Sequence, residues 1–577
     1  MKNAEIAQVF NKIADCLEFK GELSFRITSY RRAARAMMDL SEDVEEIDRR
    51  GELRSIPGIG DGMAEKIEEY LETGTMKRYE DARKGLAESL LAMMHIPGIG
   101  PKTVKVVYEK LKIESIEELE AAATDGRLAE LPGFGQKKCE NIIRGITLRK
   151  TAGRRIRLGV ALPLVESVIG QLRGKIKVAE CLPAGSLRRM RDTVGDVDIL
   201  ATGADGPAIV KAFTGLPQVQ YVLAEGDTKG TIVTGEGLQV DLRVVPEESY
   251  GAALQYFTGS KDHNIRLREI ARKKKLKVNE YGVFRGEKSI GGKTEQEVYK
   301  ILGLPWIPPV LREDRGEIDA ARQGKLPTLI ELDDIKGDLH VHTKWSDGRY
   351  SIEQMVEAAQ KRGYEYVAIS DHSLSTVIAK GLTVERLKKQ WKEIEKVRKS
   401  FPRIAILTST EMDIKPDGSL DFPDEVLEQL DIVTASVHSA FKQDRKTMTA
   451  RVIKAIENPH VDIIGHPTGR LIGEREAYDV DLEAVMKAAA ETGTALELNA
   501  QWERLDLDDL ACKRAIELGV NIVINTDAHN LTHLDFMRFG IATAQRGWVQ
   551  KENVINTRNL EELREWLERA HATAKKK

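Results

Sequence analysis

Histidines and carboxylates recur at the ends of short apolar runs between residues 337 and 529. They stand in the segments DLHVH, SDH, TEMD, SVHS, GHP and TDAH, which hold six of the eleven histidines of the chain. Imidazoles and carboxylates gathered from several strands are the ligands of a multinuclear metal site. One such histidine alone is more often a hydrogen-bonded core residue, but the repetition favours a metal site that activates water to hydrolyse a phosphoester.

The runs before these segments predict parallel strands, such as VAIS before His372 and IVINT before Asp527. Helical patterns at 351–363 and 482–493 lie between them and close on glycine, as helix C-caps do. Alternating strands and helices predict a parallel barrel or sheet, in which functional residues collect at the carboxyl ends of the strands. The histidines and carboxylates are therefore expected to meet at one edge.

A second group of carboxylates lies in two segments, PAGSLRRMRDTVGDVDIL and LQVDLRVV. Asp196 and Asp198 are two residues apart at the start of an apolar strand, so their side chains face the same side. Metal ions would offset the repulsion between them. With Asp241 from the second segment, they predict two-metal phosphoryl transfer with magnesium or manganese.

Three similar segments repeat in the first 142 residues: SIPGIGDGMAEKI, HIPGIGPKTVKVV and ELPGFGQKKCENI. Each predicts a helix, a tight glycine turn and a second helix whose N-terminus presents backbone N–H groups to an anion. Such a contact holds a DNA backbone without reading bases. One copy could be a plain helical hairpin, but three favour DNA binding through the turn glycines, Gly58, Gly60, Gly98, Gly100, Gly133 and Gly135.

Composition limits the class of protein. The 577 residues suggest several domains of ~100–200 residues each. No apolar run approaches the ~20 residues of a membrane span, and the N-terminus lacks the features of a signal peptide, so we expect a cytoplasmic protein. The four cysteines form no CxxC pair, which argues against a zinc finger or a disulfide scaffold. Basic clusters at 144–157 and 261–277 favour contact with phosphates.

The pattern from 336 to 577 resembles the signature of the PHP phosphoesterases. This resemblance implies an α/β fold, a distorted (β/α)7 barrel, and a site for up to three manganese or zinc ions. When the metal ligands of the PHP family are matched position by position to this sequence, they correspond to His340, His342, Asp347, His372, Glu411, His438, His466, Asp527 and His529.

The region 1–315 resembles the family X DNA polymerases, with a polymerase beta-like layout. The resemblance implies an α-helical helix-hairpin-helix domain at 1–90, a second helix-hairpin-helix region at 91–150, an α+β nucleotidyltransferase palm at 151–245 and a nucleotide-selecting domain at 246–315. Residues 316–335 are expected to form a linker, ordered in part at most.

The same resemblance assigns the nucleotide site. Asp196, Asp198 and Asp241 would bind the metals, with Asp241 helping to activate the primer 3′-hydroxyl. Contacts with the incoming dNTP would come from Gly185, Ser186, Arg189, Tyr256, Phe257, Gly259, Ser260, Lys261 and Asn264, and Arg268 would reach the template strand. Lys261 and His263 depart from polymerase beta, which has an acidic and an apolar residue there. A lysine at 261 could reach the triphosphate.

Lys66 occupies the position of the Schiff-base lysine of the family's 5′-deoxyribose-phosphate lyase. Arg26 and Tyr30 match the phosphate side and wall of that pocket, whereas Gly62 replaces a neighbouring lysine. An exposed helix lysine is the simpler interpretation of Lys66.

These observations predict a monomeric DNA repair polymerase that adds dNTPs in gapped or primer-template DNA. Its PHP domain would be a Mn-dependent 3′-5′ exonuclease that also acts on abasic sites or 3′ phosphates. Two alternatives remain: a DNA-docking scaffold for the PHP nuclease, and a template-independent nucleotidyltransferase beside a phosphatase of histidinol-phosphatase type.

Overall fold

The computed structural model describes residues 2–40, 44–56, 58–94, 96, 99–151 and 155–574. The chain divides into two compact units, Met1–Arg154 and Arg155–Lys577. Among the described residues, none of the helices is both long and apolar enough to cross a membrane.

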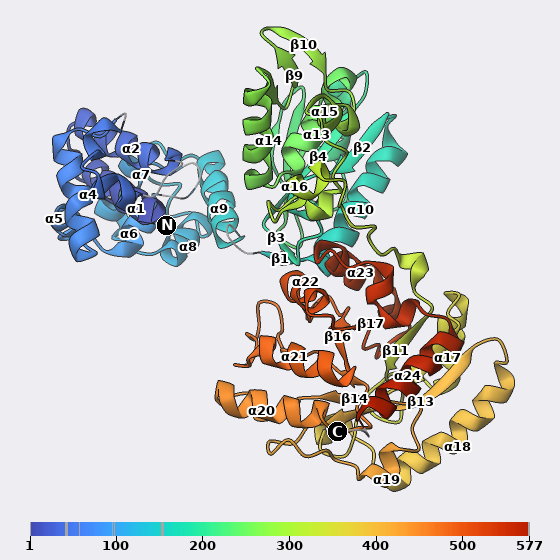
Figure 1. Ribbon diagram of the computed structural model, residues 1–577. Helices are drawn as coiled ribbons and strands as arrows, with labels where there is room; N and C mark the ends of the chain where they lie inside the picture. The colour runs from blue at the N-terminus through green and yellow to red at the C-terminus, as the bar shows by residue number, and fades with distance from the viewer. Residues whose placement is uncertain are drawn as a thin grey trace. The chain divides into compact units, whose positions relative to one another are not determined.

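The first unit is helical, as predicted (Figure 1). Two apolar cores hold it together, one running from Ile6 to Leu91 and the other from Phe19 to Ile146. Its helices are α1 (Lys2–Lys20), α2 (Ser24–Asp39), α3 (Val44–Arg49), α4 (Asp61–Thr73), α5 (Lys77–Arg83), α6 (Glu88–Met93), α7 (Pro101–Leu111), α8 (Ile116–Thr124) and α9 (Gln136–Thr151).

The second unit begins with a five-stranded sheet in the order β2-β4-β7-β6-β5. The odd residues of β4, from Val197 to Ala201, join an apolar core with α10 and α12. Leu200 on the opposite face packs with α13. The elements are β1 (Ile156–Arg157), α10 (Leu158–Lys175), β2 (Glu180–Pro183), α11 (Gly185–Arg188), β3 (Thr193–Val194), β4 (Asp196–Thr202), α12 (Gly206–Thr214), β5 (Val219–Glu225), β6 (Lys229–Thr234), β7 (Gln239–Val244) and α13 (Tyr250–Thr258).

A small antiparallel sheet in the order β10-β9-β8 and three helices follow. They are α14 (Lys261–Lys273), β8 (Lys277–Asn279), β9 (Gly282–Arg285), β10 (Lys288–Gly291), α15 (Glu295–Ile301) and α16 (Glu317–Arg322). Helix α16 lies within the segment expected to be a linker. Its Glu317 is fully buried and contacts Nδ1 of His263 at 2.5 Å, so the start of that segment packs against α14.

The C-terminal part is a parallel sheet of seven strands in chain order, from β11 to β17. A bridge between Val341 and Ala528 joins the two edge strands, and the sheet therefore nearly closes on itself. The predicted PHP-type barrel is confirmed. Its strands are β11 (Gly337–Val341), β12 (Tyr366–Ile369), β13 (Ala405–Asp413), β14 (Ile432–Ser436), β15 (Ile463–Ile464), β16 (Ala495–Asn499) and β17 (Ile522–Asn525).

Helices alternate with these strands, as the sequence pattern predicts (Figure 1). Gly493 follows α21 in the left-handed conformation, with φ +84°, which glycine adopts without steric cost. The helices are α17 (Ile352–Lys361), α18 (Val384–Ser400), α19 (Asp424–Leu427), α20 (Arg445–Ile456), α21 (Leu482–Thr492), α22 (Asp509–Glu517), α23 (Met537–Arg546) and α24 (Leu560–Ala574).

Buried charges join the barrel to the preceding sheet. Arg546 of α23 donates to the carbonyl oxygen of Arg189 (2.7 Å) and to the carboxylates of Glu313 (2.9 Å) and Asp509 (2.6 Å). Its side chain is 3% exposed. Because a buried charge must be paired to be tolerated, this network fixes the loop after α11 against the barrel.

Candidate metal centres and nucleic-acid interface

The barrel brings together all nine residues predicted as metal ligands, at the carboxyl ends of its strands. Three groups have ligand atoms within 4.8 Å of one another: His342, Asp347, His372 and His529; His340, His342 and Asp527; and His372, Glu411 and His438. His466 contacts Glu411 at 2.9 Å. The strand order thus produces the convergence that the sequence pattern predicts.

Glu411 on β13 stands at the centre of this cluster. Its Oε2 lies 2.8 Å from Nδ1 of His372, and its Oε1 lies 3.1 Å from Nε2 of His438. On the other side, Oδ1 of Asp527 lies 3.1 Å from Nε2 of His342. Together with these imidazoles, the two carboxylates would hold metal ions.

The donor set fits metal ions. Several buried side-chain atoms of the cluster make no hydrogen bond of good geometry, although buried polar groups normally do. They are Nε2 of His340, both ring nitrogens of His342, Nδ1 of His372, His438 and His466, Oε2 of Glu411 and Oδ1 of Asp527. Imidazole nitrogens and carboxylate oxygens are also the donors that zinc and manganese accept.

The protonation states of His342 and Glu411 agree with this interpretation. Burial, followed by the nearby His529 and His372, lowers the pKa of His342 to about 3, so its ring is neutral. Burial alone would raise the pKa of Glu411, but the surrounding histidines hold it well below its usual range. Despite burial, the neighbouring carboxylates raise the pKa of His340 well above its usual value and the pKa values of His438 and His529 to about 9. Because metals bind neutral imidazoles and ionised carboxylates, these three rings would release protons when ions bind.

Sequence reasoning missed Glu497, a fully buried carboxylate on β16. Its Oε1 lies 2.7 Å from Nδ1 of His340, and its Oε2 accepts from the backbone N–H of His466 at 2.7 Å. Glu497 thus orients the candidate ligands His340 and His466 through hydrogen bonds. The segment LELNA contains no histidine, and only the position of Glu497 at the end of a parallel strand could have indicated it.

We expect Glu497→Gln to weaken manganese binding by about 10- to 100-fold, the usual cost of losing a carboxylate behind a ligating histidine. Titration of the metal-stripped protein with manganese, followed by calorimetry, would measure this. Glu425→Gln, an exposed position in α19, is the control. Unchanged manganese affinity in Glu497→Gln would show that His340 needs no such support.

The second centre forms on the five-stranded sheet. Strands β4 and β7 are parallel neighbours, and their register places Asp198 opposite Asp241. Asp196, two residues before Asp198 on β4, belongs to the same face as Leu200 and α13. The structure therefore brings the three predicted carboxylates to one place, as two-metal chemistry requires.

Basic side chains compensate this negative charge in part. Lys229 lies 3.3 Å from Asp241, and Arg243 lies 3.6 Å from Asp198. Thr231 donates to Asp241 at 2.5 Å. Burial raises the pKa of Asp198 despite Arg243, and the carboxylates of Asp241 and Asp196 raise it further. This is the electrostatic state that a bound cation would relieve.

Of the residues predicted to bind the triphosphate, Gly185 lies beside these carboxylates, whereas Arg189 is engaged elsewhere. Gly185 has φ +63°, and a Cβ built on it would lie 4.0 Å from both Asp198 Oδ2 and the carbonyl oxygen of Phe257. The Arg189 guanidinium donates to Glu313 (3.0 Å) and to the carbonyl oxygen of Thr258 (2.5 Å). In this structure Arg189 thus connects the loop after α11 to the end of α13.

The segment YFTGSKDHNIRLR spans the end of α13 and most of α14. Tyr256 and Phe257 are half-buried rings in edge-to-face contact at 5.2 Å, and Arg243 lies 4.6 Å above Phe257. Asn264 donates to the carbonyl oxygen of Tyr256 at 2.8 Å. Two of the other predicted residues, Lys261 and Arg268, are exposed on α14, whereas Gly259 and Ser260 are buried between the helices.

His263, the other departure from the polymerase beta pattern, is fully buried. It contacts Glu317 and, at 2.8 Å, the hydroxyl of Tyr299. His263 therefore connects α14 to α15 and α16, and its role in this structure is to hold these helices together.

In the first unit, a cavity of about 390 Å³ is lined by Phe25, Arg26, Ser29, Tyr30, Met63 and Arg78. The predicted pocket residues Arg26 and Tyr30 are among them, but Lys66 is not. The Lys66 ammonium donates to the carbonyl oxygen of Gly62, 2.5 Å away. Lyase chemistry at Lys66 stays a prediction.

The hairpin turns begin helices as predicted. Gly60 and Gly100 are the N-caps of α4 and α7. Gly58 and Gly133 have φ +97° and +82°, a conformation that favours glycine. Gly135 directly precedes α9, whereas Gly98 lies outside the described residues.

Replacing Gly58 or Gly133 by valine should weaken binding to gapped duplex by about tenfold without sequence preference, because backbone N–H contacts read no bases and a β-branched residue resists positive φ. Fluorescence anisotropy on two gapped duplexes of different sequence would measure this, and Gly126→Val, at another positive-φ turn, is the control. Equal loss in the control would mean that the turns only support the fold.

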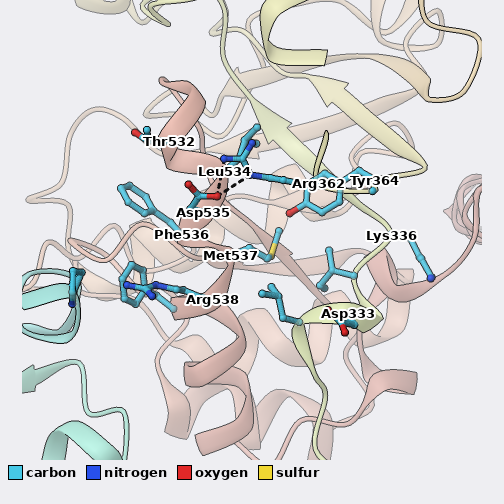
Figure 2. Close-up of a pocket in the computed structure, with 16 residues that line it drawn as sticks. Asp333, Lys336, Arg362, Tyr364, Thr532, Leu534, Asp535, Phe536, Met537 and Arg538 are labelled. Carbon is cyan, nitrogen blue, oxygen red and sulfur yellow. Dashed lines mark hydrogen bonds and ion pairs between the residues drawn. The ribbon is translucent and has the colours of Figure 1, made fainter. Parts of the chain in front are cut away.

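A cavity of about 810 Å³ holds none of the predicted site residues (Figure 2). Arg362 pairs with Asp535 in its wall at 2.7 Å. Gly159 and Pro163 of α10 line the same cavity as Arg538 of α23, so it lies where α10 meets the barrel.

Comparisons with known proteins find matches to both the polymerase part and the PHP part of the chain. Family models match at residues 1–76 (helix-hairpin-helix domain), 90–147 (SAM-like helix-hairpin-helix tandem), 253–313 (DNA polymerase beta thumb) and 338–501 (PHP domain). A Bacillus subtilis protein named DNA polymerase/3′-5′ exonuclease PolX is 41% identical over 577 residues, covering 99% of this chain and 100% of its own.

Two further relatives each match one part. DNA polymerase lambda of Rattus norvegicus is 26% identical over 54% of this chain and 56% of its own. A probable phosphatase of Thermoanaerobacter sp. is 32% identical over 40% of this chain and 93% of its own. With the full-length match, these findings confirm the predicted family: the chain is an enzyme that belongs to the bacterial family X DNA polymerases with a C-terminal PHP domain.

Proposed function

We propose that this enzyme fills short gaps in DNA by adding dNTPs to a primer 3′ end, and that its PHP domain is a Mn-dependent 3′-5′ exonuclease. The observation that carries the first activity is the register of Asp198 opposite Asp241 beside Gly185. The full-length relative named for both activities supports the pairing of polymerase and nuclease in one chain.

In the polymerase half, Asp196, Asp198 and Asp241 would hold two magnesium or manganese ions. When bound, such ions stabilise the charge that develops on the transferring phosphoryl group. Asp241 accepts hydrogen bonds from Thr231 and Gln239, one on each oxygen, and the carboxylate oriented in this way would help to activate the primer 3′-hydroxyl. The backbone N–H groups of Gly185 and Ser186 would bind the triphosphate.

In the PHP half, the nine ligands from His340 to His529 would hold up to three manganese or zinc ions. When bound, these supply a Lewis acid and acidify a water. The protein orients its own donors through Glu497 and keeps His342 neutral. Incision at abasic sites and removal of 3′ phosphates are proposed as further activities of the same site.

Hydrolysis of small phosphate esters is a second candidate for the PHP half. It is favoured by the match to a probable phosphatase over 40% of the chain. The test is to supply metal-stripped enzyme with manganese and measure the shortening of a 5′-labelled primer and the release of phosphate from histidinol phosphate. We expect shortening of the primer to dominate.

We also propose that the boundaries between the functional domains lie near residues 90, 150, 245, 315 and 335. The hairpin turns and the exposed cations of α14, Lys261 and Arg268 among them, would then contact DNA and nucleotide.

A further inference from the structure

Three strongly exposed apolar side chains lie together in the loop that directly follows the candidate ligand His372. Leu374, Val377 and Ile378 have exposed fractions of 51%, 78% and 101%. We call these three the apolar tip. Soluble proteins rarely leave such a group uncovered unless it contacts something. The tip takes no part in the metal cluster and is left uncovered by the barrel that carries it.

The first stem of the loop is attached to the ligand-bearing strands. The Ser373 N–H donates to the carbonyl oxygen of Glu411 at 3.0 Å, and the Leu382 N–H donates to that of His372 at 2.7 Å. Asp421 accepts from the Ser373 hydroxyl (2.7 Å) and the Ser375 N–H (2.7 Å). Both ends of the loop are therefore fixed beside the centre.

The second stem reaches another ligand-bearing segment. Arg386 donates to the carbonyl oxygen of Lys380 at 2.7 Å and also to that of Trp345, which lies between two candidate ligands. Lys344 and Lys380 are exposed at these positions. Two cations beside an apolar tip match a nucleic acid, which offers phosphates and flat apolar base faces together.

The geometry limits how far the tip can act. Val377 is five residues beyond His372, so it can lie at most about 18 Å away. Six of the nine candidate ligands are buried, whereas Asp347 is exposed and His438 and His529 are half-buried. For its scissile phosphate to reach the buried ligands, a paired 3′ terminus would have to release its terminal nucleotide from the duplex. Apolar side chains pushed between base steps are a known means of unstacking a duplex.

We propose that the apolar tip is a wedge that contacts the bases of a paired DNA 3′ end and separates the terminal nucleotide from its partner strand. The inference rests on the proposed exonuclease activity and assigns its substrate specificity. Leu374, Val377 and Ile378 act on the bases, while Lys344 and Lys380 bind the backbone of the strand being shortened.

The test compares the double variant Val377→Ser/Ile378→Ser with the full-length wild type in manganese. Substrates are a 5′-labelled strand with a fully paired 3′ end, the same strand alone, and bis(p-nitrophenyl) phosphate. We expect shortening of the paired end to slow by about tenfold or more, with hydrolysis of the small diester unchanged and the single strand affected less. Val377→Leu/Ile378→Leu should restore the rate on the paired end.

Leu332→Ser, which removes an apolar side chain that is 48% exposed elsewhere, is the matched control, and nucleotide addition by each preparation reports on folding. Equal slowing on paired and single strands, no slowing on either, or loss of diester hydrolysis would each overturn the wedge. The wild type is measured first. If the wild type shortens neither strand, the exonuclease assignment itself is wrong, and the wedge proposal, which depends on it, is wrong as well.

Discussion

Asp198→Ala is expected to abolish nucleotide addition, with a loss of about a thousandfold or more, because metal-bound carboxylates support several kcal/mol of transition-state stabilisation and about 1.4 kcal/mol is tenfold in rate. Shortening of a primer should stay within about twofold, because the nine candidate ligands of the barrel come from other strands. Primer extension and primer shortening on the same gapped duplex measure both.

Asp227→Ala removes an exposed carboxylate from the same part of the chain and is the matched control. Burial and the neighbouring carboxylates raise the pKa of Asp198, so its charged form is unfavourable in the folded protein. Removal of this carboxylate should therefore not lower the melting temperature. If Asp198→Ala lost both activities with an unchanged melting temperature, the two centres would not be independent.

Asp527→Ala should have the opposite effect. We expect exonuclease activity to fall by about a thousandfold or more, because the carboxylate contacts His342 at 3.1 Å and water replaces a metal ligand poorly. Nucleotide addition should stay within about twofold. The metal content of the purified variant, measured by mass spectrometry, should fall by at least one ion per chain relative to wild type.

Asp479→Ala, an exposed carboxylate of the same barrel, controls for a general effect of charge. Retained metal content and retained primer shortening in Asp527→Ala would contradict the assignment of this carboxylate as a ligand.

The fold was predictable where local sequence determines it. Parallel strands in a barrel end at one edge, so the residues after VAIS, IAILTST and IVINT could be placed together without a structure. The structure confirms this convergence, and the role of the nine residues as ligands stays a prediction. The helix starts at Gly60 and Gly100 followed in the same way from the turn chemistry.

Pairings between residues far apart in the sequence were harder to predict. The sequence indicates that Asp196 and Asp198 share a face, but the pairing of Asp198 with Asp241 depends on β4 and β7 becoming neighbours. The only sequence signal for Glu497 was its place at the end of a predicted parallel strand, and its importance depends on His340 packing beside it. The same holds for Glu317, whose burial against His263 gives structure to a segment expected to be a linker.

We propose that one chain both extends and shortens the same DNA strand at two separate metal centres. The most direct measurement uses metal-stripped enzyme reloaded with manganese and a 5′-labelled primer in a gapped duplex, with and without dNTPs, alongside histidinol phosphate. We predict that the primer lengthens to fill the gap when dNTPs are present and shortens from its 3′ end when they are absent, with little phosphate released from the small ester. Efficient turnover of histidinol phosphate by an enzyme that leaves the primer at its original length in both conditions would contradict the account.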